Sequence, residues 1–296
     1  MSEPKRHHYL PQHAYLRFFS VNAAGKKVFQ YQRGGRPFTT NLRNVGVERS
    51  LYSLTDPAGR PNQDLEKLVL SRLDGRTAPI MQRLNQEENQ VVLSDDELDV
   101  LHNIVTFALL RTPAFRDALR RLGSELIGNP DRFYPTMRAE LSALGVPEEK
   151  IESHVENALQ HVREVASQRD YWLIRVGRLA TRTNDALRLK RVELLVVDNE
   201  MIVTSDHPVA LDYTRGVLDS DLVFPVGSRR VLVMQTATGG GNSVLPIRKI
   251  SASDARQLNK QTMRHAENFL YAEAAHEKIR RLFDGTIKPT RLTRRT

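Results

Sequence analysis

The sequence predicts an α+β fold, with one mostly helical single domain and a small, mainly antiparallel sheet. Helical spacing dominates the middle of the 296-residue chain, apolar runs typical of strands follow it, and a capped helical pattern comes last. Because helices and strands are grouped rather than alternating, a doubly wound parallel sheet is not expected. No repeat or long linker divides the chain, so we expect a single domain over residues 1–285 and a basic tail over residues 286–296.

The amino-terminal third is expected to hold an anchor, a strand and a helix. In "KRHHYLPQHAYLRFF", aromatic residues such as Tyr15 and Phe19 are expected to bury the terminus. Residues 28–31 predict a short strand, which the glycines and proline of "RGGRPFTTN" end. Helical spacing follows over residues 65–84, and Gly75 is expected to interrupt it.

The stretch "LSDDELDVLHNIVTFALL" predicts the clearest helix. Ser94 is followed three residues later by Glu97, which is the spacing of a capping box. Pro113 is expected to kink or end this helix, because proline lacks the backbone N–H that a helix interior needs. A further helix is expected from Pro147, and residues 168–190 continue the helical pattern.

The last third predicts strands and a closing helix. "RVELLVVDNEMIVTSDHPV" predicts two strands joined at Asp198–Asn199, a pair that favours turns, and "DLVFPVGSRRVLVMQT" predicts one or two more. "SASDARQLNKQTMRHAENFLYAEAA" predicts a capped closing helix whose buried face includes Leu258, Met263 and Phe269–Leu270.

Composition limits the classes of function. Cysteine is absent, which excludes disulfides, thiolate metal sites and cysteine hydrolases. No apolar stretch has the length of a membrane helix or a signal-peptide core, so a cytoplasmic protein with no membrane contact is expected. The 44 Lys and Arg residues exceed the 35 Asp and Glu residues, and a net charge of +9 favours nucleic acid as a partner. The basic tail has the simpler alternative of being a solvated surface.

Several fragments together resemble a bacterial and phage family, domain-of-unknown-function family 4238. The opening "HHYLPQ", residues 7–12, resembles its amino-terminal signature, and "LYSL", "DLEKLVLSRLDG", "FALLRTPAFR", "MIVTSDHPV" and "ARQLNKQTMRHA" resemble later segments in order. The resemblance spans nearly the whole chain, although Asp74 stands where the family segment is expected to carry Glu. It implies a common fold and a shared set of polar residues, and the family's occurrence suggests phage defence, but no activity is assigned to it.

A divalent metal, Mg²⁺ or Mn²⁺, is one expected ligand of these polar residues. His7 and His8 are the candidate imidazole ligands, and Glu66, Asp74 and Asp206 are the acids in the resembling segments. Adjacent side chains on an extended segment point to opposite faces, so one of the two histidines is expected to enter a given site. The alternative is a structural histidine pair with acids at the surface.

Catalysis is expected to depend on His8, Asp206 and Arg111. Asp206 could bind metal or act as a base, and Arg111 could neutralise charge on a phosphate. The alternative places Asp206 in the turn "TSDHP" and pairs Arg111 with a core acid, while Thr112 caps a helix that starts at Pro113.

Five residues are expected to contact a substrate: Gln12, Tyr52, Thr112, His207 and Asn259. Tyr52 and Asn259 enter this set through the family resemblance, and His207 is a candidate proton donor. Together these residues predict a metal-dependent phosphodiesterase or nuclease that acts on nucleic acid or nucleotides. The alternative is a protein that binds nucleic acid or another ligand without catalysis.

Overall fold

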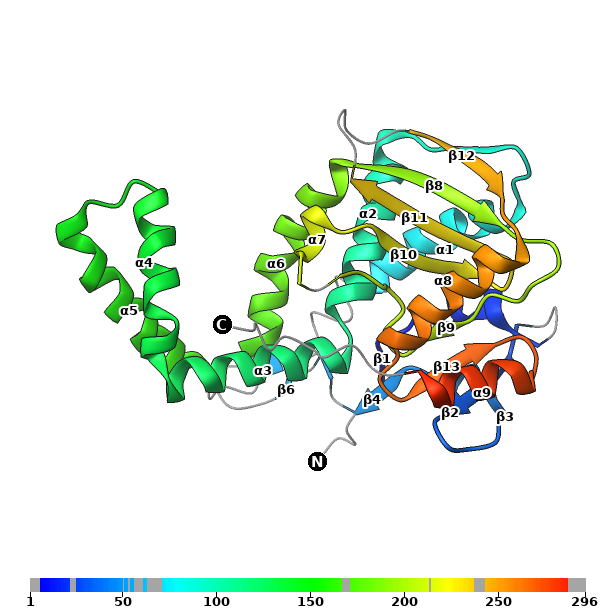
Figure 1. Ribbon diagram of the computed structural model, residues 1–296, viewed down its shortest axis with the longest axis horizontal. Helices are drawn as coiled ribbons and strands as arrows, with labels where there is room; N and C mark the ends of the chain where they lie inside the picture. Colours follow the sequence, from blue (N-terminus) through cyan, green and yellow to red (C-terminus); the bar gives the residue numbers. More distant parts are fainter. Residues whose placement is uncertain are drawn as a thin grey trace.

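The computed structural model describes residues 6–21, 25–49, 51–52, 54–55, 61–62, 71–166, 171–212, 214–236 and 243–286. These residues form an α+β fold, as predicted, with two main sheets and a helical arm that extends to one side of the body (Figure 1). No helix among them is long and apolar enough to cross a membrane.

The larger sheet has five strands and is antiparallel except for one pair. In spatial order the strands are β10 (Leu222–Gly227), β11 (Arg230–Thr236), β8 (Lys190–Val196), β12 (Val244–Lys249) and β7 (Gln90–Val92). β12 and β8 form the parallel pair. Side chains alternate between the two faces, so one face of β8 packs Leu194 into the main core and the other packs Leu195 against a second cluster.

Helices cover both faces of this sheet. The main core includes residues of α1 (Ser71–Gln86) and α2 (Asp95–Leu110), while the opposite face packs against α8 (Ala252–His265). Figure 1 shows α8 in front of the strands and α1 and α2 behind them. The sheet is therefore covered on both sides, which explains why β10 and most of β11 are continuous apolar runs in the sequence.

The smaller sheet has four antiparallel strands. In spatial order these are β3 (Phe38–Asn41), β2 (Lys27–Gln32), β13 (Phe269–Ala272) and β9 (Thr204–Ser205). α9 (Glu277–Gly285) packs Ile279 and Phe283 against this sheet. Two short antiparallel ladders complete the strands: β1 (Arg6–His8) with β4 (Val47–Arg49), and β5 (Leu54–Thr55) with β6 (Pro61–Asn62).

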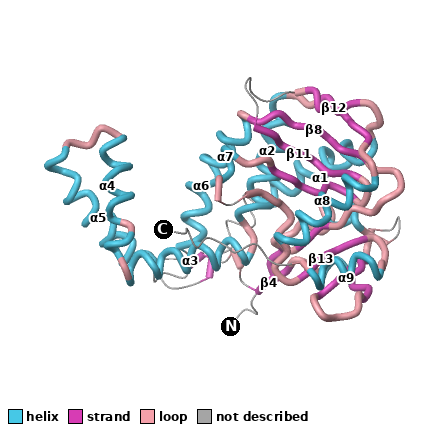
Figure 2. The backbone as a smooth tube through the Cα atoms, in the orientation of Figure 1, coloured by secondary structure: helices cyan, strands magenta, loops and turns pink. Residues whose placement is uncertain are grey.

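The arm consists of three helices that leave the body and a fourth that returns to it. The helices are α3 (Pro113–Gly128), α4 (Tyr134–Ala143), α5 (Glu148–Ala166) and α6 (Tyr171–Arg188). α5 contacts both α3 and α4, and α6 packs on α2 (Figure 2). Within the described ranges, the remaining helical segments are α7 (Gly216–Asp219) and the 3₁₀ turns over Leu16–Phe19, Leu42–Asn44 and Pro130–Arg132.

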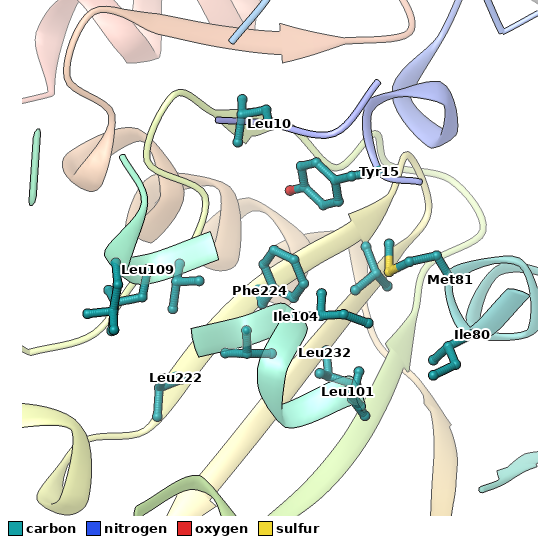
Figure 3. Packing of buried hydrophobic residues seen from close by; sticks show 14 of the residues in the cluster. Leu10, Tyr15, Ile80, Met81, Leu101, Ile104, Leu109, Leu222, Phe224 and Leu232 are labelled. Carbon is teal, nitrogen blue, oxygen red and sulfur yellow. The ribbon is translucent and has the colours of Figure 1, made fainter. Parts of the chain in front are cut away.

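The amino-terminal aromatic anchor is confirmed. Leu16 and Phe19 are fully buried, and the Tyr15 hydroxyl donates to the Pro225 carbonyl at 2.9 Å and lies 2.5 Å from the Thr204 hydroxyl. The Tyr15 ring stacks on Phe224, with ring centroids 5.3 Å apart. Figure 3 shows Tyr15 between the amino-terminal segment and the strands of the larger sheet. These contacts fix the amino-terminal segment to the core.

Two helix predictions based on local signals are confirmed. The Ser94 hydroxyl accepts a hydrogen bond from the Glu97 N–H, and the Glu97 carboxylate accepts one from the Ser94 N–H, which completes the capping box of α2. α2 ends at Leu110, and α3 begins at Pro113 with Thr112 as its N-cap. Proline is well accommodated there, because the first N–H groups of a helix have no partner within it.

The expected break at Gly75 is wrong. α1 continues through both Gly75 and Pro79. Its buried residues Ile80 and Met81 pack into the main core, and this tertiary packing outweighs the local cost of about 1 kcal/mol for glycine and about 3 kcal/mol for proline. Residues 65–70 of the same predicted helical stretch lie outside the described residues.

The predicted hairpin at Asp198–Asn199 is also wrong. Only Thr204–Ser205 of its second half forms a strand, and this strand pairs with β13 instead of β8. Asn259 supplies the reason: its Oδ1 accepts the Val203 N–H at 3.0 Å and its Nδ2 donates to the Met201 carbonyl at 2.7 Å. A side chain therefore satisfies the buried backbone that a neighbouring strand would otherwise pair.

The closing helix is shorter than expected. α8 ends at His265, and the expected helical residues Phe269–Leu270 belong to β13. Met263 and Leu270 are buried as predicted, but on different kinds of element. β13 can form here because β2 and β9 offer it unpaired edges on both sides, a long-range contact that local periodicity does not report.

Candidate functional site

The amino-terminal segment, residues 6–12, lies between two cavities. The first, here called the histidine cleft, has a volume of about 370 Å³ and is lined by His8, Pro11, Gln12, His13, Ala14, Tyr52, Ser71, Asp74, Gly75 and Ala78. The second, the arginine cavity, has a volume of about 410 Å³ and is lined by Tyr9, Pro113, Ala114, Asp117, Arg121, Asp206, Arg264, Ala266, Glu267, Asn268 and Phe269. His8 and Tyr9 line different cavities because successive side chains of an extended segment point in opposite directions.

His7 is part of the core. Its side chain is fully buried, and its Nδ1 accepts the backbone N–H of Tyr52 at 2.8 Å. The two rings are parallel within 4°, with centroids 5.7 Å apart. One histidine of the pair therefore packs against Tyr52 and the other faces a cavity, in agreement with the expectation that adjacent histidines diverge.

His8 is half-buried at the wall of the histidine cleft. Its Nε2 lies 2.7 Å from the Gln12 side-chain nitrogen and 3.3 Å from the Arg43 carbonyl. Burial lowers the pKa of His8 below 6.5, while the Arg43 carbonyl and the Asp74 charge act in the opposite direction. His8 is therefore mainly neutral at pH 7 and able to accept a proton from a ligand or water.

Arg111 connects three segments around the cleft. It is the C-cap of α2, and its buried guanidinium donates from Nε to the Tyr9 carbonyl at 2.9 Å. Both terminal nitrogens lie 3.4 Å from one carboxylate oxygen of Asp74, and the Arg111 carbonyl accepts the Tyr52 hydroxyl at 3.1 Å. Arg111 therefore pairs with an acid, as the alternative expects, but this acid is the partly exposed Asp74 and not a core residue. The pairing holds the Asp74 carboxylate at the cleft.

Thr112 and His207 form a buried pair on the other side of Arg111. The Thr112 hydroxyl lies 2.9 Å from His207 Nδ1 and also accepts the Phe115 N–H, as the N-cap of α3. The Ser205 hydroxyl accepts the His207 N–H and donates to the His207 carbonyl. Thr112 and His207 are the two predicted substrate-binding residues of this pair, and both are at least 98% buried. Their contact joins the start of α3 to the segment after β9.

Asp206 has a carboxylate that is engaged with the backbone. One oxygen accepts the Glu267 N–H at 2.8 Å, and the other accepts the N–H groups of Asn268 at 2.8 Å and Phe269 at 3.2 Å. These bonds fasten the connection between α8 and β13 to the end of β9. Its side chain lines the arginine cavity, so the structure places Asp206 in a different cavity from His8.

Of the five predicted metal ligands, the structure brings His8 and Asp74 to one cavity. Asp206 lines the other cavity, His7 packs on Tyr52, and Glu66 lies outside the described residues. In the part of the chain that is described, no group of three or more histidines and acids is placed to hold a metal ion.

The predicted substrate-binding residues divide similarly. Gln12 and Tyr52 line the histidine cleft, whereas the Asn259 side chain is committed to the backbone of residues 201–203. Sequence reasoning missed Arg121 and Arg264 in the arginine cavity. Arginines on exposed helix faces have no distinguishing spacing, and only the position of Tyr9 within the amino-terminal signature pointed toward that cavity.

Comparison with known proteins gives a family match without an assigned activity. The family model described as a protein of unknown function, DUF4238, matches residues 6–276. No curated protein and no solved structure matches the chain.

Proposed function

The chain belongs to the DUF4238 family of unknown function, and from its histidine cleft we propose that it is a phosphodiesterase or nuclease acting on nucleic acid or nucleotides. One observation carries the proposal: His8, a neutral half-buried imidazole, shares a cavity with the Asp74 carboxylate. Histidine is the commonest group for proton transfer near neutral pH. The net charge of +9 supports a polyanionic substrate.

In this proposal His8 removes the proton from a water molecule that attacks phosphorus. The new bond to phosphorus replaces the bond to the leaving oxygen, and protonated His8 can then return its proton to the product or to solvent. Gln12 contacts the imidazole and restricts its rotation, while Asp74 favours the protonated form electrostatically. Arg111 acts through Asp74, because it holds that carboxylate in place.

A divalent cation, Mg²⁺ or Mn²⁺, is the cofactor that the carboxylate of the cleft supports in this proposal. Asp74 would hold it, with Glu66 as the further candidate ligand, and His8 would stay unbound to the metal so that it can act as the base. When bound, such an ion neutralises charge on the phosphate and lowers the pKa of a coordinated water. Metal analysis of the purified protein, before and after treatment with a chelator, tests this part of the proposal separately.

His8→Ala is expected to lower the rate of phosphodiester cleavage by about 100-fold, the usual effect of losing a positioned general base. Cleavage of a fluorescent single-stranded oligonucleotide and of a dinucleotide, each with Mg²⁺ or Mn²⁺, measures the effect. His154→Ala is the matched control, because His154 lies exposed on α5 in the arm. Absence of cleavage by the wild type in every condition, or equal losses in the two variants, would contradict the proposal.

The pH dependence of cleavage provides a separate test. Because burial holds the pKa of His8 below 6.5, we expect kcat/KM to be level above neutral pH and to fall as the pH drops through that pKa. The decline approaches tenfold per pH unit once His8 is mostly protonated, since only the neutral ring accepts a proton. A rate that increases toward acidic pH would require a protonated group instead, and His8 would lose its assigned role.

Binding without catalysis is the second candidate function. It is favoured by the commitment of Asp206 to three backbone N–H groups and by the lack, within the described ranges, of a three-ligand metal cluster. In that case the wild type and His8→Ala would bind an oligonucleotide without cleaving it. Affinity would fall with rising salt, as expected for release of counterions from a polyanion.

A further inference from the structure

The arginine cavity lies on the opposite side of the amino-terminal segment from the histidine cleft. Four parts of the chain form it: the first turns of α3, Asp206 after β9, the end of α8 with its connection to β13, and the segment that carries Tyr9. Asp117 and Arg121 are four residues apart on α3 and therefore lie on the same face of that helix. Its volume of about 410 Å³ is sufficient for a phosphate group with part of the molecule that carries it.

Two of the three acids at this cavity already have defined partners. Asp117 accepts a hydrogen bond from the Arg116 Nε at 2.9 Å, and Asp206 accepts three backbone N–H groups. Glu267 is the third acid and is half-buried. The carboxylates of Asp117 and Asp206 are thus occupied by donors within the protein itself.

Arg121 and Arg264, unlike Asp117 and Asp206, have guanidinium groups that are available to a ligand. Neither guanidinium has a hydrogen bond or ion pair with any residue that the structure describes. They approach the same cavity from two elements, α3 and the last turn of α8. Two guanidinium groups of this kind form a clamp for an anion with several oxygens, because each can donate two parallel hydrogen bonds.

Tyr9 adds a neutral donor to the cavity. Tyr9 is only 8% exposed and lines the cavity. Burial is the main cause that raises the pKa of Tyr9, so the phenol keeps its proton across the physiological range. The exposed side-chain amide of Asn268 provides further N–H donors at the rim.

We propose that the arginine cavity is a phosphate-binding site, in which Arg121 and Arg264 clamp the anion and Tyr9 and Asn268 complete its hydrogen bonds. A phosphate group suits this donor set better than a carboxylate, because it offers more oxygens than one guanidinium can pair. The phosphate can come from a free mononucleotide or from a nucleic-acid strand. The site is separate from His8 and does not depend on hydrolysis at the histidine cleft.

Titration of the full-length protein with inorganic phosphate, followed by calorimetry and by thermal unfolding, tests the site. Arg121→Gln and Arg264→Gln are each expected to weaken binding about tenfold or more, because each removes charge-assisted hydrogen bonds to the anion. Arg120→Gln is the matched control: it removes the same charge from α3, and Arg120 is not among the residues that line the cavity. It is expected to change the affinity by less than about twofold.

Two results would overturn the phosphate site. One is the absence of saturable phosphate binding by the wild type. The other is equal weakening by Arg120→Gln, Arg121→Gln and Arg264→Gln, which would mean that only the overall charge matters. His8→Ala is expected to retain full phosphate binding, so a protein that binds phosphate but cleaves nothing would refute the proposed hydrolase and leave this site intact.

Competition experiments distinguish the two sources of the phosphate. A 5′-mononucleotide and a short single-stranded oligonucleotide are each titrated against bound phosphate in the wild type and in Arg264→Gln. If the oligonucleotide displaces phosphate at a lower concentration than the mononucleotide does, and that difference disappears in Arg264→Gln, the site is assigned to a nucleic-acid strand. Displacement by the mononucleotide alone assigns it to a free nucleotide.

Discussion

Asp206→Asn is expected to lower the free energy of unfolding by about 3 kcal/mol. The carboxylate accepts three backbone N–H groups, and Asp206 is only 4% exposed. An amide of the same size keeps one oxygen as an acceptor but turns an NH₂ group toward at least one of those donors. The change therefore removes charge-assisted hydrogen bonds and leaves a buried N–H unpaired, which is one of the costly kinds of substitution.

Urea unfolding monitored by circular dichroism measures this effect. Asp198→Asn is the control, because it makes the same chemical change at a carboxylate that is 60% exposed and paired only with Lys249 at the surface. It is expected to shift stability by no more than about 0.5 kcal/mol. Equal stability of Asp206→Asn and Asp198→Asn would show that the three backbone contacts do not determine the role of Asp206.

The same variant separates a structural role of Asp206 from the role of metal ligand that its sequence context predicts. If the carboxylate only fastens the α8–β13 connection, Asp206→Asn should keep its cleavage rate per folded molecule at temperatures well below its midpoint of unfolding. If Asp206 binds metal, the rate should fall even where the variant is fully folded. Measuring activity and folded fraction at each temperature distinguishes the two outcomes.

The sequence predicts most reliably those features that depend on neighbours in the chain. Ser94 and Glu97 cap α2, and Thr112 and Pro113 start α3, because helix termini are determined within one turn. The hairpin at Asp198–Asn199 fails for the opposite reason. In the second half of the predicted hairpin, the backbone N–H of Val203 donates to the Asn259 side chain. Asn259 is 56 residues away in the chain, so no local pattern records that contact.

The candidate site also combines contacts that are local in the sequence with contacts between distant residues. His8 and Gln12 are four residues apart in the opening signature, and their side chains are in contact in the structure. Asp74 lines the same cleft from α1 and is hydrogen-bonded there by Arg111 at the end of α2, a long-range contact that no local pattern records. Arg121 and Arg264 line one cavity from α3 and from the last turn of α8, so only the three-dimensional structure relates them.

The interface between α2 and α6 contains a polar group with an unusual environment. His102 lies on the apolar stripe of α2, which predicts a core histidine, and it is 1% exposed. Neither ring nitrogen has a hydrogen-bond partner among the described residues. Burial lowers the pKa of His102 to about 4, with Asp99 opposing and Arg188 adding to that shift.

Acidification is therefore expected to destabilise the protein through His102. Above pH 6.5 the ring is neutral in both the folded and unfolded states, and its contribution to stability is fully present. Between pH 6.5 and about 4 only the unfolded state binds the proton, so stability falls as the pH falls, and the loss levels off below the folded pKa. A difference of this size corresponds to at most about 3 kcal/mol.

His102→Leu is expected to remove most of that pH dependence while preserving stability at pH 8, because leucine fills a similar volume and has no polar atoms that need partners. Urea unfolding at pH 8, 6 and 5 measures the slope, and His161→Leu, at an exposed position of α5, should keep the slope of the wild type. An unchanged slope in His102→Leu would assign the acid sensitivity to other groups. A large loss of stability at pH 8 would instead show that leucine does not fit the packing around the imidazole.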